Sequence, residues 1–300
     1  MALRVIPVPG RGAEDVVVGP DGAVYTGTED GVVHRVDPDG RVARVADTGG
    51  RPLGIELLPD GRLLVCDARR GLLAVDPASG ATESLTDVPM LFCNNAAVAA
   101  DGTIYVSDSS TVHPIDAWKA EMVELTRTGR LLRRDPGGRI EVLLDGLAFA
   151  NGVALAADES FVAVAETAAR TVVRLRLTGP RAGERDLLVA DLPGYPDNIA
   201  RGSDGLIWVS IASPRDPVVE LLQRSPVPVR RLVTRIPERL QPAPKRTVRV
   251  QAYGDAGRLV RDLAEDAAGY HMVTGVREHD GRVWLGSLHE PTIAVLDPAG

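Results

Sequence analysis

Several features that mark special classes of protein are missing from this sequence of 300 residues. It has no run of about 18 apolar residues, so a membrane-spanning helix is not expected. The first residues, MALRVIPVPGRG, lack the long apolar core of a secretory signal, and only two cysteines occur, Cys66 and Cys93. We therefore expect a cytoplasmic protein with reduced, mostly buried thiols. A net charge of −7 argues against nucleic acid as a partner.

What the sequence does contain is a repeated phrase. The stretch EDVVVGPDG, at residues 14–22, is a short apolar strand pattern that ends in an Asp-Gly turn. Variants return at 53–61, 94–102, 151–159 and 197–205, and a shorter copy stands at 274–281. A period of about 40 residues with several short strands is typical of a β-propeller blade. The sequence therefore predicts an all-β, six-bladed β-propeller in which residues 1–300 form a single domain.

The last repeat unit predicts how the ring closes. It ends with TIAVLD and a DPAG turn, where the other units continue into a fourth strand. The apolar segment LRVIPV, residues 3–8, belongs to no other blade. We expect this N-terminal strand to pair with the last blade, which leaves no sheet edge exposed at the junction.

Two segments interrupt the rhythm of the blades, 111–126 in blade 3 and 212–246 in blade 5. Both fall between the second and third strands, which places them on one face as a helical cap. The first contains one short helical pattern, and the second contains two, separated by Ser-Pro-Val-Pro. In the second, five apolar residues share a helical face: Val229, Leu232, Val233, Ile236 and Leu240. This face either packs on the propeller or, through residues 216–246, makes weak contact with a membrane surface.

The first residue of each phrase has a shared place in a propeller. The innermost strand of every blade starts at one mouth of the central channel, so six residues should meet there: Glu14, Leu53, Asn94, Asn151, Asp197 and Thr274. Two carboxylates among carboxamides are costly to bury without a counter-ion. An all-oxygen set suits Ca²⁺, or else Mg²⁺ or Mn²⁺. The alternative is that these side chains only bond a column of water.

Three longer phrases carry a resemblance to a known family. GRPLGIELLPDGRLLVCDARRGLLAVDP, FANGVALAADESFVAVAET and LPGYPDNIARGSDGLIWVSIASPR resemble the strictosidine synthase-like branch of the regucalcin/gluconolactonase (LRE-like) superfamily of calcium-dependent six-bladed propellers. The resemblance implies a central calcium held by Glu14, Asn94, Asn151 and Asp197, joined, as in paraoxonase-like members, by Asn198. Plant strictosidine synthase uses a glutamate where this chain has Thr274, so its condensation reaction is not expected here.

These observations point to a metal-dependent hydrolase of an apolar ester or lactone. The cation would polarise the carbonyl, and Asp197, or a water that it orients, would act as base or nucleophile. His271 and His289 are candidate proton shuttles; alternatively they are ordinary rim histidines. Two other functions stay open: a biosynthetic enzyme that performs condensation or isomerisation in the same pocket, and a ligand-binding propeller without enzymatic activity.

Overall fold

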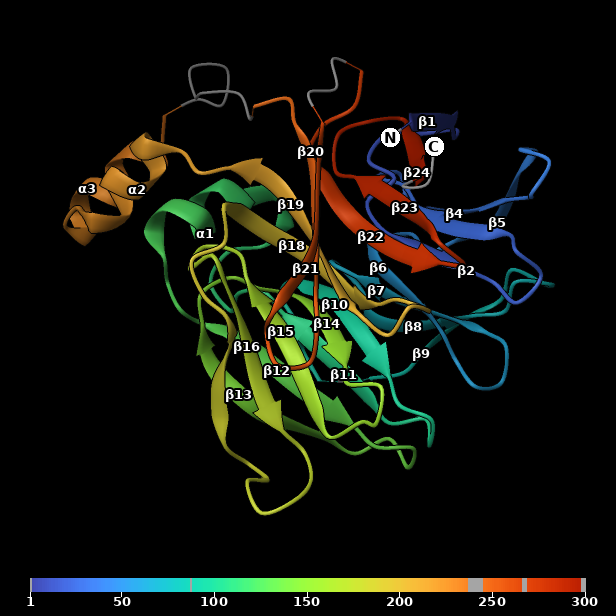
Figure 1. Cartoon of the computed structure of the whole chain (residues 1–300), viewed down its shortest axis with the longest axis horizontal. Coiled ribbons are helices and arrows are strands. Elements are labelled where there is room, and N and C mark those ends of the chain that lie inside the picture. Colours follow the sequence, from blue (N-terminus) through green and yellow to red (C-terminus); the bar gives the residue numbers. More distant parts are fainter. Residues whose placement is uncertain (1, 87, 237–244, 266–268, 298–300) are drawn as a thin grey trace.

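The computed structural model of the protein describes residues 2–86, 88–236, 245–265 and 269–297. Six four-stranded antiparallel sheets are arranged around a central axis (Figure 1), which confirms the predicted six-bladed propeller. The innermost strand of each blade lies against those of its neighbours. In blade order these strands are β2 (Val16–Val18), β6 (Pro52–Leu57), β10 (Cys93–Val98), β14 (Ala150–Leu155), β18 (Gly194–Arg201) and β22 (Val273–His279).

The remaining strands follow outward from each inner strand. In blades 1 to 3 they are β3 (Val24–Gly27), β4 (Val32–Val36), β5 (Val42–Asp47), β7 (Leu63–Asp67), β8 (Gly71–Val75), β9 (Thr82–Ser84), β11 (Ile104–Asp108), β12 (Gly129–Arg134) and β13 (Ile140–Leu147). In blades 4 to 6 they are β15 (Phe161–Glu166), β16 (Thr171–Arg176), β17 (Arg185–Val189), β19 (Ile207–Pro214), β20 (Val248–Tyr253), β21 (Leu259–Glu265), β23 (Arg282–Ser287) and β24 (Thr292–Asp297).

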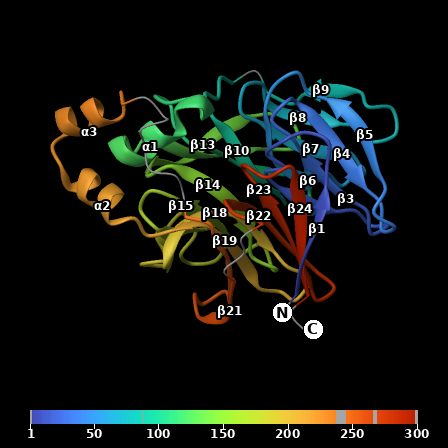
Figure 2. The same cartoon turned by 90° about the horizontal axis from the view of Figure 1, so that it is seen from above.

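The N-terminal strand closes the ring as predicted. Strand β1 (Ala2–Pro7) pairs antiparallel with β24, with Arg4 opposite Val295 and Ile6 opposite Ile293. The sixth sheet thus takes its outermost strand from the other end of the chain, and the two described ends lie side by side (Figure 2). This pairing joins the first and last blades by backbone hydrogen bonds, so the ring has no open junction.

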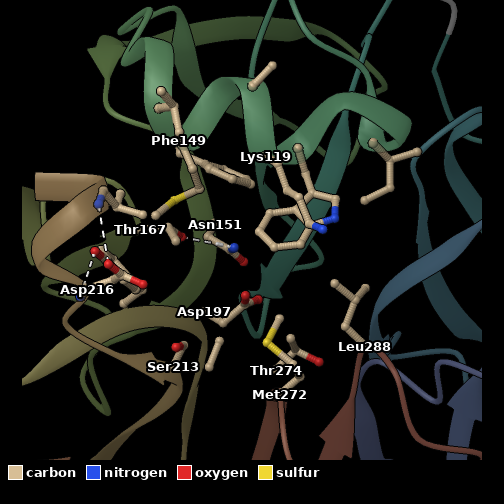
Figure 3. Close-up of a pocket in the computed structure, with 18 of the residues that line it drawn as sticks. Lys119, Phe149, Asn151, Thr167, Asp197, Ser213, Asp216, Met272, Thr274 and Leu288 are labelled. Carbon is tan, nitrogen blue, oxygen red and sulfur yellow. Dashed lines mark hydrogen bonds between the residues drawn. The ribbon is translucent and has the colours of Figure 1, made fainter. Parts of the chain in front are cut away.

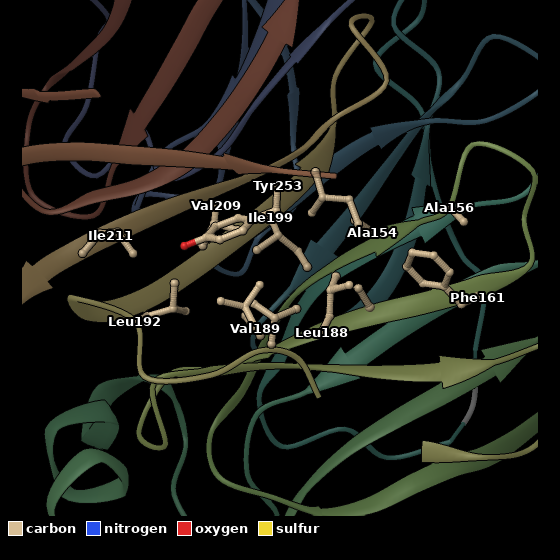
Figure 4. Packing of buried hydrophobic residues seen from close by; sticks show 14 residues of the cluster. Ala154, Ala156, Phe161, Leu188, Val189, Leu192, Ile199, Val209, Ile211 and Tyr253 are labelled. Carbon is tan, nitrogen blue, oxygen red and sulfur yellow. The ribbon is translucent and has the colours of Figure 1, made fainter. Parts of the chain in front are cut away.

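Apolar side chains between neighbouring blades hold the ring together. Between blades 4 and 5, for example, Ala154 and Phe161 pack in one buried cluster with Ile199 and Val209 (Figure 4). Along β14 and β15 they alternate with residues such as Val153 and Val162, which pack in a second buried cluster on the other side of the blade. The phrase therefore encodes the contact between blades as well as the channel lining.

Five of the inner strands share an irregularity at their starts. In β6, β10, β14, β18 and β22 the pairing register shifts across the first and second residues of the repeated phrase, as between Cys93 and Ala96 in β10. Such a β-bulge breaks the strict alternation of side chains along a strand. It allows two consecutive residues, such as Asn94 and Asn95, both to make contacts inside the ring.

The described parts of the two insertions form four short helices beside the channel mouth. The first contains a short 3₁₀ helix, η1 (Ile115–Ala117), followed by α1 (Trp118–Glu124), and the second contains α2 (Pro217–Arg224) and α3 (Val227–Val233). Asp216 caps α2 by accepting hydrogen bonds from the backbone N–H groups of Val218 and Val219, at 2.8 and 3.5 Å. Among the described residues no helix is long and apolar enough to span a bilayer.

The second insertion differs from its prediction in two respects. Strand β19 continues to Pro214, because Ser213 and Pro214 pair with Tyr195 and Gly194 of β18. Helix α3 ends at Val233, so the proposed apolar face does not run through Ile236 on one helix, and Leu240 lies outside the described residues. Leu232 is 68% exposed, so this face is divided between the protein and solvent.

Candidate metal centre and substrate cavity

A cavity of about 370 Å³ lies over one mouth of the channel, between the propeller and the helices. Its lining includes the first residue of all six phrases: Glu14, Leu53, Asn94, Asn151, Asp197 and Thr274. Figure 3 shows Asn151, Asp197 and Thr274 converging at one end of it. The structure therefore brings together the residues that the repeat placed in equivalent positions, while their role as metal ligands stays a prediction.

Three buried carboxamide groups in this region have the same arrangement. The side-chain amino group of Asn94 donates to the Ser109 hydroxyl at 2.9 Å, and that of Asn151 donates to the Thr167 hydroxyl at 3.1 Å. The amino group of Asn198 donates to both carboxylate oxygens of Glu14, at 3.3 Å each. The side-chain oxygen of each of these three asparagines is buried without a hydrogen-bond partner. Because a buried acceptor without a partner is costly, these three oxygens have the chemistry expected of ligands for a cation.

Glu14 and Asp197, the two carboxylates beside these asparagines, are destabilised when they are ionised. Burial, with the nearby charge of Asp197, raises the pKa of Glu14 well above its ordinary value. Burial raises the pKa of Asp197 to about 8. Arg51 contributes positive charge near Glu14 and donates a hydrogen bond to the carbonyl of Gly12 at 3.0 Å. A cation bound between Glu14 and Asp197 would favour their ionised forms and remove this penalty.

The donor set fits a hard divalent cation. Two carboxylates and three carboxamide oxygens supply oxygen ligands only, as Ca²⁺ prefers. Within the described part of the chain, no group of three or more His, Cys, Asp or Glu side chains is arranged to hold a metal. The carboxamides are therefore essential to the fit, and a softer ion that needs nitrogen or sulfur ligands is not favoured.

Glycines at the second position of alternate phrases make the ring narrow. Gly54, Gly152 and Gly275 stand where the other three phrases have Asp15, Asn95 and Asn198. A Cβ on Gly152 would lie 2.0 Å from the backbone nitrogen of Ile199, and one on Gly54 would lie 2.7 Å from the Asn95 Cα. Each of these glycines thus lets the next inner strand approach closely.

A second polar layer lies deeper in the channel. Asp15 accepts hydrogen bonds from the Asn95 amino group at 3.0 Å and from the backbone N–H of Ile55 at 3.2 Å. Arg277 of blade 6 reaches the Glu56 carboxylate of blade 2 at 2.8 Å. Burial raises the pKa of Asp15 to about 7, although the Arg277 guanidinium opposes this rise. No pattern in the sequence indicated this layer, in which the Arg277 guanidinium lies close to two carboxylates, Asp15 and Glu56.

Most of the cavity wall is apolar and comes from both the propeller and the cap, with Lys119 and Asp216 as its charged members. Phe92 and Phe149 pack with ring centroids 5.6 Å apart. Phe149 and Met272, which each precede a phrase by two residues, have left-handed backbone conformations with φ of 62° and 50°. The other apolar lining residues include Leu53, Ile115, Trp118, Met122, Val123, Val219, Leu222, Val233, Ile236 and Leu288.

The candidate proton shuttles lie beside the cavity, not on its surface. Met272 and Leu288 line it, while their neighbours His271 and His289 do not. His271 contacts the Glu290 carboxylate through Nδ1, and its ring lies edge-on to His289 with centroids 5.4 Å apart. Burial, followed by the charges of His271 and Lys119, lowers the pKa of His289. These positions give no direct support to a catalytic role for either histidine.

Carboxylates at the end of the second strand in blades 2, 3 and 4 accept hydrogen bonds from backbone N–H groups. Asp67 accepts from the N–H groups of Arg51, Arg69 and Arg70, at 2.9 to 3.0 Å. Asp108 accepts from the N–H of Phe92, and Glu166 from that of Ala148, at 2.9 and 2.8 Å. These carboxylates fix the loops that lead into the inner strands, so they position the site without facing it.

Fold and site together define a six-bladed propeller with an oxygen-rich centre at one mouth of its channel. Two family models match parts of the chain. Residues 28–225 match the SMP-30/gluconolactonase/LRE-like region, and residues 1–36 match the strictosidine synthase-like N-terminal model. The chain belongs to the SMP-30/gluconolactonase/LRE-like family, which confirms the resemblance found in the sequence.

Curated relatives and solved structures agree with this assignment. The chain is 36% identical to strictosidine synthase-like protein 10 of Arabidopsis thaliana, over 83% of this chain and 70% of that protein. It is 33% identical to the adipocyte plasma membrane-associated protein of Rattus norvegicus, over 95% and 83%. A gluconolactonase from Xanthomonas campestris superposes with a TM-score of 0.71 at 16% identity, covering 98% and 89% of the two chains. The calcium-binding protein regucalcin of Agrobacterium tumefaciens gives 0.67 at 13%, covering 97% and 94%.

Proposed function

We propose that this chain is a Ca²⁺-dependent hydrolase of an ester or lactone with an apolar body. The observation that carries the proposal is the set of three buried, unpartnered carboxamide oxygens beside two carboxylates of raised pKa. The gluconolactonase and calcium-binding protein among the structural relatives support the same class of chemistry. Mg²⁺ or Mn²⁺ are the alternatives that an all-oxygen donor set allows.

Most of these residues would only hold the ion, whereas Asp197 would both contribute to the ligand set and act on the substrate. Glu14, Asn94, Asn151 and Asn198 are buried, and their oxygens would be ligands. When bound, the cation would polarise the substrate carbonyl and stabilise the oxyanion that forms. Asp197 is less buried than Glu14 and lines the cavity, so it is the carboxylate placed to orient or deprotonate a water.

The cavity wall selects an apolar body for the substrate. Above the polar end, most of the lining consists of Phe92, Phe149, Trp118 and the aliphatic cap residues, and Lys119 and Asp216 are its charged members there. Burial of an acyl or aryl group there would contribute about 25 cal/mol for each Å² removed from water. A hydrophilic sugar lactone would gain little from such a wall, so a hydrophobic lactone or aryl ester fits better.

The direct test is a panel of aryl esters and lactones, measured with added Ca²⁺ and with a chelator. We expect the chelator to abolish turnover, and Asp197→Asn to lower kcat by roughly 100-fold or more. Glu14→Gln should weaken Ca²⁺ binding in a calorimetric titration, while the exposed-site control Glu83→Gln should change neither quantity.

The same experiment separates the rival functions. Turnover that is indifferent to chelation and to both substitutions means that the metal-hydrolase proposal is wrong. Tight Ca²⁺ binding without turnover of any ester indicates a ligand-binding propeller. Metal-independent conversion of a substrate that has no ester bond indicates a condensing or isomerising enzyme.

A further inference from the structure

The outer surface of the second insertion is a face that the channel chemistry does not use. It consists of the residues of α2 and α3 that point away from α1 and the propeller, which we call the outer cap face. In Figures 1 and 2 these two helices lie at the edge of the molecule, next to α1. We propose that the outer cap face docks on an anionic lipid surface.

Each helix has distinct inner and outer sides. On α2, Val219 and Leu222 line the cavity and Gln223 donates to the Met122 carbonyl at 2.7 Å, while Leu221 on the outer side is 67% exposed. Val218 is 53% exposed and also lines the cavity, so it lies at the border between the two sides. An exposed leucine alone is ordinary, but α3 continues the same pattern.

On α3 the inner side is fixed to α1 by polar contacts. Arg230 donates to the Glu124 carbonyl at 2.6 Å, and the Thr234 hydroxyl donates to the Glu124 carboxylate at 2.9 Å. The outer side carries Val229 and Leu232, which are 44% and 68% exposed. The two helices therefore present one row of large apolar side chains to solvent while their inner sides are held by the protein.

The charged residues on the outer cap face are all cationic. Arg224 and Arg231 are exposed, although Arg231 also reaches the Glu124 carboxylate of α1 at 3.7 Å. Arg235, two residues past the end of α3, is exposed as well and adjoins this face. The acidic residue of α2, Glu220, is turned to the protein, where it pairs with Arg215 at 2.6 Å and with Arg170 at 3.6 Å. In a chain of net charge −7, a surface that combines arginines with apolar side chains is a marked exception. It complements a membrane with negative headgroups, because the apolar residues enter the interface and the arginines meet the phosphates.

The cavity opens next to this face. Val218 and Ile236 both line the cavity and are 53% and 41% exposed, so they belong to its rim as well as to the surface of the cap. A docked protein would hold the apolar cavity against the lipid. An amphiphilic substrate would then enter from the bilayer; this part of the inference rests on the proposed function, whereas the docking does not.

Docking is tested by sedimentation of the full chain with lipid vesicles, without substrate or added metal. We compare vesicles of phosphatidylcholine with vesicles that also contain about 30% phosphatidylserine. We expect binding to the second kind only, and weakening in high salt because the arginine contribution is screened. Equal binding to both kinds, or binding to neither, would overturn the proposal.

Two matched pairs of variants locate the contact. Leu221→Ser with Leu232→Ser should lower the partition coefficient at least about tenfold, whereas Val142→Ser with Leu187→Ser, at 49% and 55% exposed positions on other blades, should not change it. Arg224→Gln with Arg235→Gln should also weaken binding, in contrast to Arg258→Gln with Arg261→Gln, which are exposed on blade 5.

Neither pair in the cap lines the cavity, so turnover of a water-soluble ester should be retained. Loss of vesicle binding in the control pairs as well would refute the assignment to the outer cap face. Concentration-dependent dimerisation that the leucine variants abolish, with no lipid binding, would show that a second copy of the chain covers the face instead. Failure of ester turnover with intact vesicle binding would reject the proposed function alone.

Discussion

The channel mouth and the helical cap enclose the same cavity but are built in opposite ways. At the channel mouth, side chains come from inner strands whose positions are fixed by six sheets, and each carboxamide is held by a specific hydroxyl or carboxylate. In the cap, short helices from two insertions meet through a few polar contacts and leave large apolar residues exposed. A rigid geometry is needed at the channel mouth because a polar group stabilises a nearby charge only when it is held in the correct position.

This difference predicts how each region tolerates change. Substitutions in the channel should affect folding and metal binding together, since the same contacts serve both. Substitutions in the cap should affect substrate choice or surface binding and leave the propeller intact.

The largest effect should come from the narrow ring itself. Gly152→Ala places a Cβ 2.0 Å from the backbone nitrogen of Ile199, and backbone cannot move aside as a flexible side chain can. We expect a loss of at least ~3 kcal/mol in the free energy of unfolding, measured in urea. Gly254→Ala is the control, because a Cβ at that position would have no neighbouring atom within 4 Å. Equal stability of the two variants would show that the channel is more plastic than its geometry indicates.

The buried guanidinium of the second polar layer should come next. Arg277→Met leaves the buried Asp15 and the half-buried Glu56 without their positive partner, which should cost about 3 kcal/mol. The exposed pair of Arg249 with Asp262, at 2.6 Å, is the matched control, and Arg249→Met should cost less than about 1 kcal/mol. Urea unfolding of both variants measures the difference. A small loss in Arg277→Met would mean that water already balances the charge of this layer.

The effect of pH on Ca²⁺ stabilisation follows from the raised carboxyl pKa values. Asp197, near pKa 8, and Asp15, near pKa 7, bind protons in the metal-free folded state at pH values where the unfolded chain has lost them. Stability of the metal-free protein should therefore fall as the pH rises from about 4 to about 8. Bound Ca²⁺ offsets this loss because it favours the ionised ligands.

Thermal unfolding with and without Ca²⁺ checks this linkage. The gain in Tm on adding Ca²⁺ should be roughly 5 °C larger at about pH 8.5 than at about pH 6. Asp197→Asn should reduce the pH dependence of that gain. A Ca²⁺ effect that is equal at both pH values would place the ion away from these carboxylates.

The sequence was sufficient for the six blades and for the meeting of the six first residues, because one phrase carries both the strand pattern and the channel position. The closing strand also followed from the repeat, since the sixth unit needed a partner for TIAVLD. The metal ligands, the acid–base residues and the cytoplasmic location stay predictions.

Other features of the site depended on register between distant strands. The pairing of Arg277 with Glu56 joins blades 2 and 6, and no local pattern states that these residues meet. The alternation of Gly54, Gly152 and Gly275 with larger polar residues was visible in the sequence, but its meaning required the distance between inner strands. The end of α3 at Val233 was missed because helical spacing alone does not show where a helix stops.

In the cap, Trp118→Ala should change substrate selection more than stability. Trp118 lines the cavity from α1 and is only partly buried. Its removal should raise KM for bulky aryl esters about tenfold and have little effect on a small acetate ester, because only the bulky group reaches this wall. Steady-state kinetics on the two substrates provides its own control. Equal losses on both would place Trp118 in the reaction and not in substrate selection.

The smallest effect should come from the two histidines beside the cavity. His271 is held by Glu290, His289 packs edge-on against it, and neither side chain lines the cavity. Burial lowers the pKa of His289, so near neutral pH its imidazole is mostly unprotonated and has no extra proton to donate. We expect His289→Gln to change kcat/KM less than about threefold, with no change in the pH profile. Loss of one limb of that pH profile, together with a large fall in kcat, would instead show that proton transfer passes through this pair of histidines. The chemistry would then extend from the channel mouth to the rim of the cavity.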